Sequence, residues 1–186
     1  MSQRYSIRLE IAAPEDYPAW MRRLQEAFTP AAAQYYGVCE PVPSEESVRH
    51  SLHAAGADVY HIVLDGRRVG GAVVIADRTT GRSTLELFFL APDCHGRGIG
   101  LAAWRAIEAR YPHTAVWQTI TPYFEQRNIH FYINKCGFHI VEFFNAHHVD
   151  PALPRPDAGT DAPAPGMDAY FLFEKTMRPS ARAHGR

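Results

Sequence analysis

Apolar and polar residues alternate along several short stretches of the chain, and this period of two residues is typical of half-buried β-strands. Alternating stretches and short apolar runs of strand length predict strands at Tyr5–Ile11, Val59–Leu64, Val69–Ala76, Thr84–Leu90, Ala115–Ile120, Phe138–Phe144 and Asp168–Thr176. Between the second and third of these strands, Asp65-Gly66 predicts a tight hairpin turn.

Apolar residues recur at helical spacing in the remaining segments. Trp20, Leu24 and Phe28 follow one another at four-residue intervals, which predicts a helix that opens near Pro14. Ser44, followed by two acidic residues, predicts the N-cap of a short second helix. Two more helices are predicted at Gly98–Tyr111 and Asn128–Cys136. This order of elements predicts one α/β domain with a mixed sheet over residues 1–177, followed by a flexible tail at 178–186.

Composition narrows the class of protein. The chain has 186 residues, 46% of them hydrophobic, and 19 basic against 20 acidic residues give a formal charge of -1. A balanced charge gives no general attraction to nucleic acid or to an anionic membrane. No apolar run reaches the length of a membrane span, and the N-terminus has no secretory signal. We therefore expect a cytoplasmic protein without nucleic-acid or membrane partners.

The cysteines and histidines predict neither disulfide bonds nor a metal site. Cys39, Cys94 and Cys136 are odd in number and widely spaced, which favours reduced thiols over disulfides. The adjacent pair His147 and His148 lacks the spacing and the nearby carboxylate of a zinc site. We expect no bound metal.

A glycine-rich run follows the predicted strand that ends at Leu90. In His95-Gly96-Arg97-Gly98-Ile99-Gly100, glycines at every second position let the backbone approach a ligand closely. A helix follows at once, so its free amides and the positive end of its dipole face the loop and suit a phosphate or pyrophosphate. A plain tight turn is the alternative for such a loop taken alone.

Two other phosphate-binding loops fit this run less well. An ATP-binding loop needs a lysine followed by serine or threonine, but Gly100 is followed by Leu101. A dinucleotide-binding loop follows an early strand and precedes an acidic residue by about 20 positions. Here the loop comes after a predicted three-stranded meander in the middle of the chain.

The loop resembles a hallmark of the GNAT superfamily of N-acetyltransferases, Gln/Arg-x-x-Gly-x-Gly/Ala after the fourth strand. Gly98 and Gly100 match its glycines, and Leu90-Ala91-Pro92 matches the hydrophobic approach to it. His95 departs from the pattern at the Gln/Arg position. The departure affects one side-chain contact but leaves the backbone cradle in place.

A second segment resembles the other signature of the same family. Asn128, Phe131, Tyr132, Gly137 and Phe138 match Asn-x-x-x-Phe-Tyr-x-x-x-x-Gly-Phe at every named position. Alone, these aromatic residues would be ordinary core residues. The resemblance implies a mixed, mostly antiparallel sheet of six or seven strands flanked by helices, with a splayed pair of central strands.

The resemblance also implies acetyl-CoA as cosubstrate and an amine as acceptor, with homodimerisation left open. Its implied cofactor-binding residues are Phe89, Leu90, Ala91, His95, Gly96, Arg97, Gly98, Ile99, Gly100, Leu101, Asn128 and Phe131. Tyr132 is implied as the acid that protonates the leaving thiolate, a role that suits a phenol with a pKa of about 10.

Glu86 is the candidate base. It lies four residues before Leu90, so alternation predicts that both side chains share a strand face. Burial between apolar neighbours would raise its pKa toward a useful range. The alternative is a solvent-facing residue that alternates with Leu85 and Leu87.

The acceptor is not encoded in a motif. Thr119, Thr121 and Tyr123 are candidate lining residues of an acceptor pocket, with Trp117 and Phe88 as its apolar walls. The early helix and the proline-rich Asp150–Gly166 segment, which is expected to be a loop, contain no motif that identifies the acceptor. The predicted function is N-acetylation of a primary amine through a ternary complex; the alternative is a non-catalytic acyl-CoA-binding or regulatory module.

Overall fold

The computed structural model describes residues 5–37, 41–152 and 169–177. The part of the predicted loop at Asp150–Gly166 that follows residue 152 lies outside the described residues. Cys39 and the predicted tail at 178–186 lie outside them as well.

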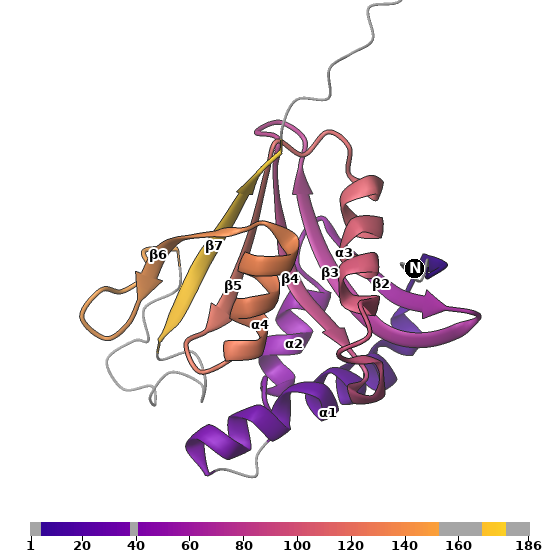
Figure 1. Cartoon of the computed structure of the whole chain (residues 1–186), viewed down its shortest axis with the longest axis horizontal. Coiled ribbons are helices and arrows are strands. Elements are labelled where there is room, and N and C mark those ends of the chain that lie inside the picture. Colours follow the sequence, from indigo (N-terminus) through magenta and orange to yellow (C-terminus); the bar gives the residue numbers. More distant parts are fainter. Residues whose placement is uncertain (1–4, 38–40, 153–168, 178–186) are drawn as a thin grey trace, which may run out of the picture.

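A seven-stranded sheet forms the centre of the protein, with the strand order β1-β2-β3-β4-β5-β7-β6 (Figure 1). The strands are β1 (Ile7–Ile11), β2 (Ala57–Leu64), β3 (Arg67–Asp77), β4 (Arg82–Leu90), β5 (Val116–Pro122), β6 (His139–Phe144) and β7 (Tyr170–Thr176). Neighbouring strands are antiparallel except β4 and β5. This confirms the predicted mixed, mostly antiparallel sheet.

The two central parallel strands separate along their length. Only Arg82–Thr84 of β4 pair with Val116–Gln118 of β5, although β4 continues to Leu90. Beyond these pairs the strands part, so their last residues no longer share backbone hydrogen bonds. The predicted splayed pair of central strands is therefore confirmed, and it opens the sheet at the end where both strands terminate.

Helices cover both faces of the sheet (Figure 1). The helices α1 (Tyr17–Tyr36) and α2 (Glu45–Leu52) pack on one face, and α3 (Ile99–Arg110) and α4 (Gln126–His130) pack on the other. Short 3-10 turns lie at Pro14–Asp16 and Pro92–Cys94. A π-helical turn, Phe131–Cys136, continues α4 and ends at the left-handed Gly137. The fourth helix therefore begins before the predicted Asn128 and widens in its second half.

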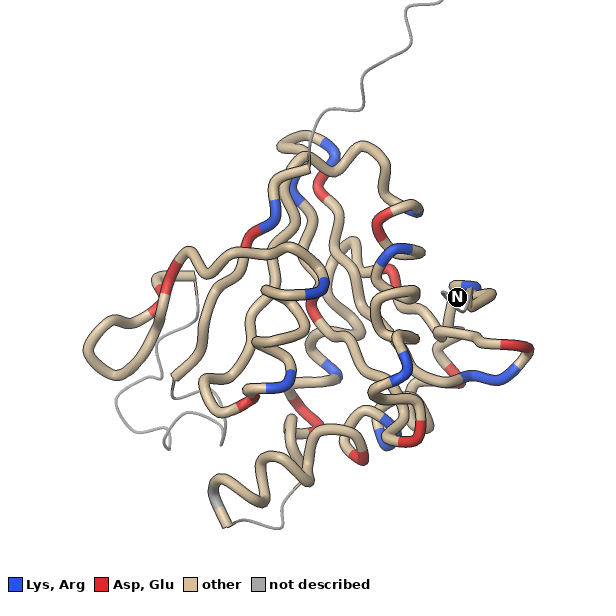
Figure 2. The backbone as a smooth tube through the Cα atoms, in the orientation of Figure 1, with Lys and Arg blue, Asp and Glu red and all other residues tan. Residues whose placement is uncertain are grey.

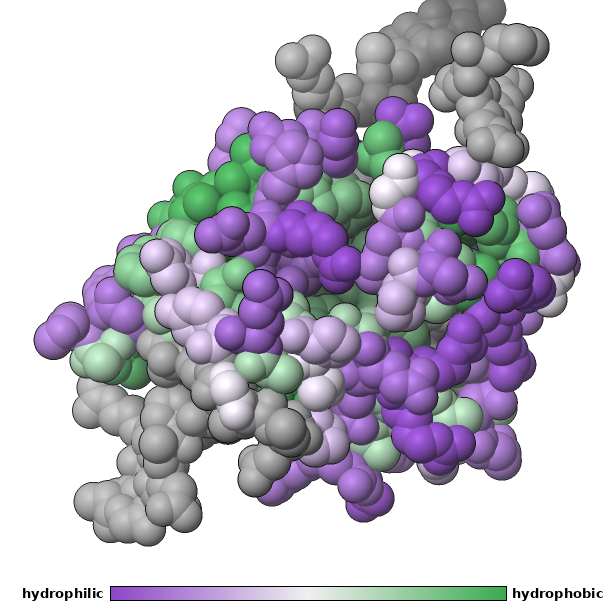
Figure 3. Space-filling view, turned by 60° about the horizontal axis from the view of Figure 1, so that its bottom comes forward, coloured by the Kyte–Doolittle hydropathy of each residue, from purple (hydrophilic) through white to green (hydrophobic). Residues whose placement is uncertain are grey.

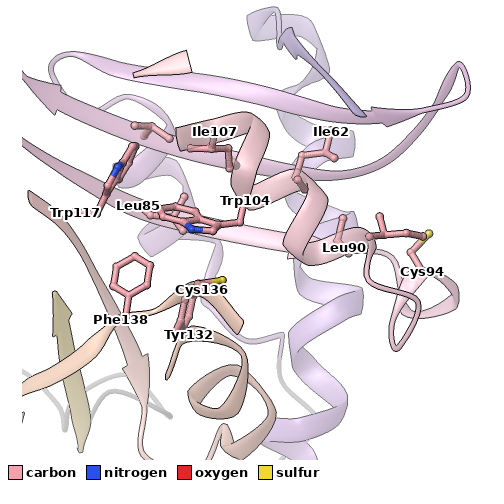
Figure 4. Close-up of a cluster of buried hydrophobic side chains, with 14 of the residues drawn as sticks. Ile62, Leu85, Leu90, Cys94, Trp104, Ile107, Trp117, Tyr132, Cys136 and Phe138 are labelled. Carbon is pink, nitrogen blue, oxygen red and sulfur yellow. The ribbon is translucent and has the colours of Figure 1, made fainter. Parts of the chain in front are cut away.

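Each face has its own hydrophobic core. Under α3 and the π-helical turn, the largest buried side chains include Trp104, Trp117 and Phe138, which Figure 4 shows together with Tyr132 and Cys136. The core under α1 and α2 is built on Trp20, Leu24, Val48 and Phe89, among others.

Gly71 of β3 sets how closely α1 approaches the sheet. A Cβ added there would lie 2.3 Å from Nε1 of Trp20, so a side chain would displace the indole. That indole N–H donates a hydrogen bond of 3.0 Å to the Tyr60 carbonyl of β2. The absent side chain thus lets α1 lie against β2 and β3.

Charged residues are dispersed over the fold. Figure 2 shows basic and acidic positions interspersed along the backbone. Within the described part of the chain, no helix has the length and apolar character needed to cross a membrane. Among the same residues, no group of three or more His, Cys, Asp or Glu side chains is placed to hold a metal ion.

Candidate active site

The glycine-rich loop joins the end of β4 to the first turn of α3. Gly96 and Gly98 have φ values of 72° and 80°, a left-handed backbone that side-chain-bearing residues rarely adopt. Gly98 is the N-cap of α3, so the free amides of the first turn face the loop. A Cβ added to Gly100 would lie 3.3 Å from Cε2 of Phe131, so Gly100 lets the start of α3 approach the π-helical turn.

A cavity of about 490 Å³ lies beside this loop. Nine of the predicted cofactor-binding residues line it: Phe89, Leu90, His95, Gly96, Gly98, Gly100, Leu101, Asn128 and Phe131. Figure 3 turns forward the side of the molecule on which α1 lies, and shows a hollow with apolar side chains at its base and polar ones around it. The structure therefore brings the two sequence motifs together around one cavity.

Three predicted cofactor-binding residues are not among the lining residues of this cavity. Ile99 is buried in the core under α3, where the first helical turn directs it. Arg97 is exposed on the loop. The backbone of Ala91 continues the sheet, since its N–H donates to the Val69 carbonyl at 2.8 Å.

Basic residues of the fourth helix complete the cavity, and the sequence analysis did not select them. Arg127, His130 and Lys135 line it opposite the glycine-rich loop. Ala27 and Phe28 of α1 contribute an apolar wall. The available signal was the spacing of the basic residues after β5: Arg127 and Lys135 are eight residues apart, a spacing that can place both on one side of a helix. Cationic groups around a helix N-terminus suit a ligand that carries several phosphates.

One stacked pair of aromatic rings lines the cavity. The rings of Phe88 and Phe131 stack nearly parallel, 4° apart in orientation and 5.9 Å between centroids. Because Phe88 belongs to β4 and Phe131 to the π-helical turn, this stack ties the splayed end of β4 to the fourth helix.

His95 connects three parts of the site. Its Nε2 lies 3.0 Å from the Leu90 carbonyl oxygen, and its Nδ1 lies 2.7 Å from Nη1 of Arg127. A guanidinium can only donate, so Nδ1 accepts and the Nε2–H donates to the carbonyl, which is the neutral tautomer. Burial, reinforced by the Arg127 charge, lowers the pKa of His95 below its usual value. The residue that departs from the sequence pattern thus links the loop to β4 and α4.

Glu86 lies in a β-bulge of β4. Val73 of β3 pairs with Leu87 and Val74 pairs with Leu85, so Glu86 is the extra residue between them. Leu85 and Leu90 belong to the core under α3, whereas Leu87 belongs to the core under α1 and α2.

The predicted shared face of Glu86 and Leu90 is therefore wrong. The bulge interrupts the alternation of side chains, and the electrostatic interaction of Glu86 with His50 of α2 places its carboxyl on the α1–α2 side of the sheet. The carboxyl is partly buried, and burial raises its pKa, an effect that the nearby His50 of α2 opposes. The solvent-facing alternative does not fit this environment.

Tyr132 lies on the opposite side of the sheet, in the π-helical turn. Its side chain is 5% exposed, and burial raises its pKa, while the Thr119 hydroxyl acts in the other direction. Thr119 in turn donates a hydrogen bond of 2.9 Å to the Leu85 carbonyl, just beyond the last paired residues of β4 and β5. Tyr132 thus lies beside the point where the strands separate.

The two candidate catalytic residues do not line the described cavity, which reaches Phe88 on β4. Of the residues considered for an acceptor pocket, Phe88 lines this cavity, while Trp117, Thr119 and Thr121 are buried in the fold. Tyr123 is 51% exposed and packs against Phe143 and Phe171. These five residues therefore do not form one pocket.

Comparison with known proteins agrees with this geometry. The model of the Acetyltransferase (GNAT) family matches residues 17–138. The chain is 51% identical over 172 residues to the uncharacterized protein YrkN of Bacillus subtilis (strain 168), a match that covers 91% of this chain and 93% of that protein.

Two solved structures share the fold at low sequence identity. The ribosomal-protein-S18-alanine N-acetyltransferase of Escherichia coli aligns with a TM-score of 0.64 at 14% identity, over 97% of this chain and 100% of that one. An acetyltransferase of Bacillus subtilis in complex with CoA aligns with a TM-score of 0.60 at 14% identity, over 94% and 100% of the two chains.

Proposed function

The chain belongs to the GNAT acetyltransferase family, and from that premise we propose that it transfers the acetyl group of acetyl-CoA to a primary amine. One observation carries the proposal: β4 and β5 separate beside a cavity that is lined by both sequence motifs. A structural neighbour, the acetyltransferase of Bacillus subtilis, is described in complex with CoA.

The residues around the cavity fit acetyl-CoA. The backbone cradle of Gly96 and Gly98, at the N-terminus of α3, suits the pyrophosphate, and Arg127 and Lys135 supply positive charge for phosphate groups. Beyond Thr84, the edge of β4 that faces β5 has no strand partner, so it offers hydrogen bonds to the amides of the pantetheine arm, in the manner of an added strand. When bound, acetyl-CoA supplies a thioester whose acetyl group is the one transferred.

The proposed reaction uses Glu86 and Tyr132 on opposite sides of the sheet. The uncharged amine nitrogen attacks the thioester carbonyl carbon, so that a C–N bond forms and the C–S bond breaks. Glu86 accepts the proton lost by the nitrogen, directly or through a water molecule. Tyr132 gives its proton to the leaving sulfur, and both residues then exchange protons with solvent.

The positions of the two groups support this division of roles. Glu86 faces the α1–α2 side, and Tyr132 lies on the side of the fourth helix, so the proposed base and the proposed acid are separate groups on opposite sides of the sheet. The raised pKa of Tyr132 keeps the phenol protonated and able to donate. The raised pKa of Glu86 brings the carboxylate closer to neutral pH, where a general base works best.

One observation favours a second candidate, a non-catalytic acyl-CoA-binding module: neither Tyr132 nor Glu86 lines the described cavity. A thiol-release assay with acetyl-CoA and a panel of primary amines distinguishes the two functions. We expect amine-dependent release of free CoA, together with an acetylated amine detected by mass spectrometry. Calorimetric CoA binding without release from any amine would contradict the enzyme and support the binding module, and absence of CoA binding would contradict both.

A further inference from the structure

A second cavity, of about 610 Å³, adjoins the cavity beside the glycine-rich loop, where we propose that acetyl-CoA binds. It lies between the C-terminal half of α1 and the turn that leads from β5 into α4. Ala27, His95 and Arg127 line both cavities, so the two spaces meet at the pair formed by His95 and Arg127. A molecule in the second cavity would therefore lie next to bound acetyl-CoA.

Much of the wall of this cavity is apolar. Ala27, Pro30 and Ala31 present one side of α1, because they are spaced three and four residues apart. Tyr35 of α1 and Phe124 of the β5–α4 turn stack at 5.0 Å between centroids, with their ring planes 17° apart. These side chains suit the hydrocarbon part of a small ligand.

Glu125 places an acidic group in the same wall. The residue is only 4% exposed, yet it lines the cavity at the start of α4. Burial raises the pKa of its carboxyl, and the charge of Arg127 opposes this shift. Arg127 also donates to Nδ1 of His95. A buried carboxylate is costly unless it is paired, so a cationic ligand in this cavity would relieve part of that cost.

We propose that this second cavity binds the acetyl acceptor and that Glu125 anchors a positively charged group on it; this rests on the function proposed above. The anchored charge is not the amine that reacts. An attacking amine must be uncharged, whereas a carboxylate that pairs with an ammonium group keeps that group protonated. The acceptor class is therefore a small amine with a hydrocarbon spacer and a second cationic group, such as a diamine.

The test compares two acceptors that differ in one charge. Cadaverine and pentylamine have the same carbon chain, but only cadaverine carries a second ammonium group. We expect kcat/KM for cadaverine to exceed that for pentylamine at least about tenfold, equivalent to about 1.4 kcal/mol. Glu125→Gln is expected to remove this preference by raising KM for cadaverine, while kcat/KM for pentylamine and the Kd of CoA change less than about twofold. Glu15→Gln, at an exposed carboxyl, is the matched control and should behave as wild type.

Direct binding separates this proposal from the proposed function. Cadaverine is titrated calorimetrically into CoA-saturated wild type and into Glu125→Gln, which keeps the shape of the side chain. Binding that the substitution weakens at least about tenfold supports the site even if no amine releases thiol. Equal binding by both proteins, or no binding to wild type, would overturn it, as would an equal loss of kcat/KM for both acceptors in Glu125→Gln.

Discussion

Tyr132 is held among core aromatic rings, with Phe138 and Phe173 at centroid distances of 5.5 and 5.8 Å. Substitution by phenylalanine keeps this packing and removes only the hydroxyl. If Tyr132 is the acid, Tyr132→Phe should lower kcat about 10²-fold or more while the Kd of acetyl-CoA stays within about twofold. Steady-state kinetics and calorimetry check this pair of values. An unchanged kcat would remove Tyr132 from the mechanism.

The partly buried carboxyl of Glu86 predicts a pH dependence of activity. A base acts in its deprotonated form, so kcat/KM should fall as the pH decreases through the raised pKa of Glu86, above the ordinary value of about 4.3. Glu86→Gln should lose this acidic limb and lower kcat about 10²-fold. The exposed Glu142→Gln is the control. If the acidic limb of the pH profile persisted unchanged in Glu86→Gln, a group other than Glu86 would be responsible for it.

The same carboxyl affects stability with a definite sign. A pKa that is higher in the folded than in the unfolded protein means that folding favours the protonated form. The contribution of Glu86 to stability is therefore fully present below the unfolded pKa and is lost as the pH rises through the folded pKa. At neutral pH, Glu86→Gln should unfold no more easily than wild type, so its lower activity cannot be ascribed to unfolding.

At the scale of elements, the junction between β4 and α3 depends on a left-handed residue at its N-cap. Gly98 has φ 80°, and Gly66, in the turn between β2 and β3, has φ 81°; neither would bring an added Cβ closer than 3.9 Å to another residue. Leucine at either position should cost a similar ~1–2 kcal/mol of backbone strain. Only the substitution at Gly98 fills the cavity.

Gly98→Leu and Gly66→Leu therefore form a matched pair. We expect similar decreases in the free energy of unfolding, measured by urea denaturation. Calorimetry should show CoA affinity reduced at least about tenfold in Gly98→Leu and unchanged in Gly66→Leu. If Gly98→Leu binds CoA as wild type does, the loop does not cradle the cofactor.

On the scale of the whole molecule, the sheet has a weak central connection. β1–β4 and β5–β7 form two antiparallel halves, which are joined in the sheet by the short β4–β5 pairing. The cavity beside the glycine-rich loop, where we propose that acetyl-CoA binds, takes residues from both sides of this junction, namely β4 and α3 on one side and the fourth helix on the other. A ligand held there would join the two halves.

Bound acetyl-CoA should therefore stabilise the whole fold. At a free concentration of about 100 times Kd, the expected gain is ~2.7 kcal/mol. For a chain of this size, that gain corresponds to an increase in Tm of about 5–11 °C. Differential scanning calorimetry with and without acetyl-CoA measures this shift. An unchanged Tm at saturating acetyl-CoA would contradict binding to the folded protein.

Local sequence patterns were sufficient to predict the helices and strands and the glycine-rich loop. The period of two residues found the strands, because a half-buried strand alternates its faces whatever its partners are. Gly96 and Gly98 could be placed because their role depends on their own φ values. The polar ends of β3 were missed, since Arg67 and Asp77 extend the pairing without adding an apolar signal.

The sequence by itself thus determined the order of elements and the two motifs that line the cavity beside the glycine-rich loop, including the irregular His95. Only the tertiary structure decided what surrounds them. The face of Glu86 depends on a bulge in the pairing of β4 with β3, and the partners of His95 depend on how α4 meets the loop. Glu125 joins a cavity with α1 although nearly a hundred residues separate them in the chain. Such features follow from contacts between distant segments, which local periodicity and backbone preference do not encode.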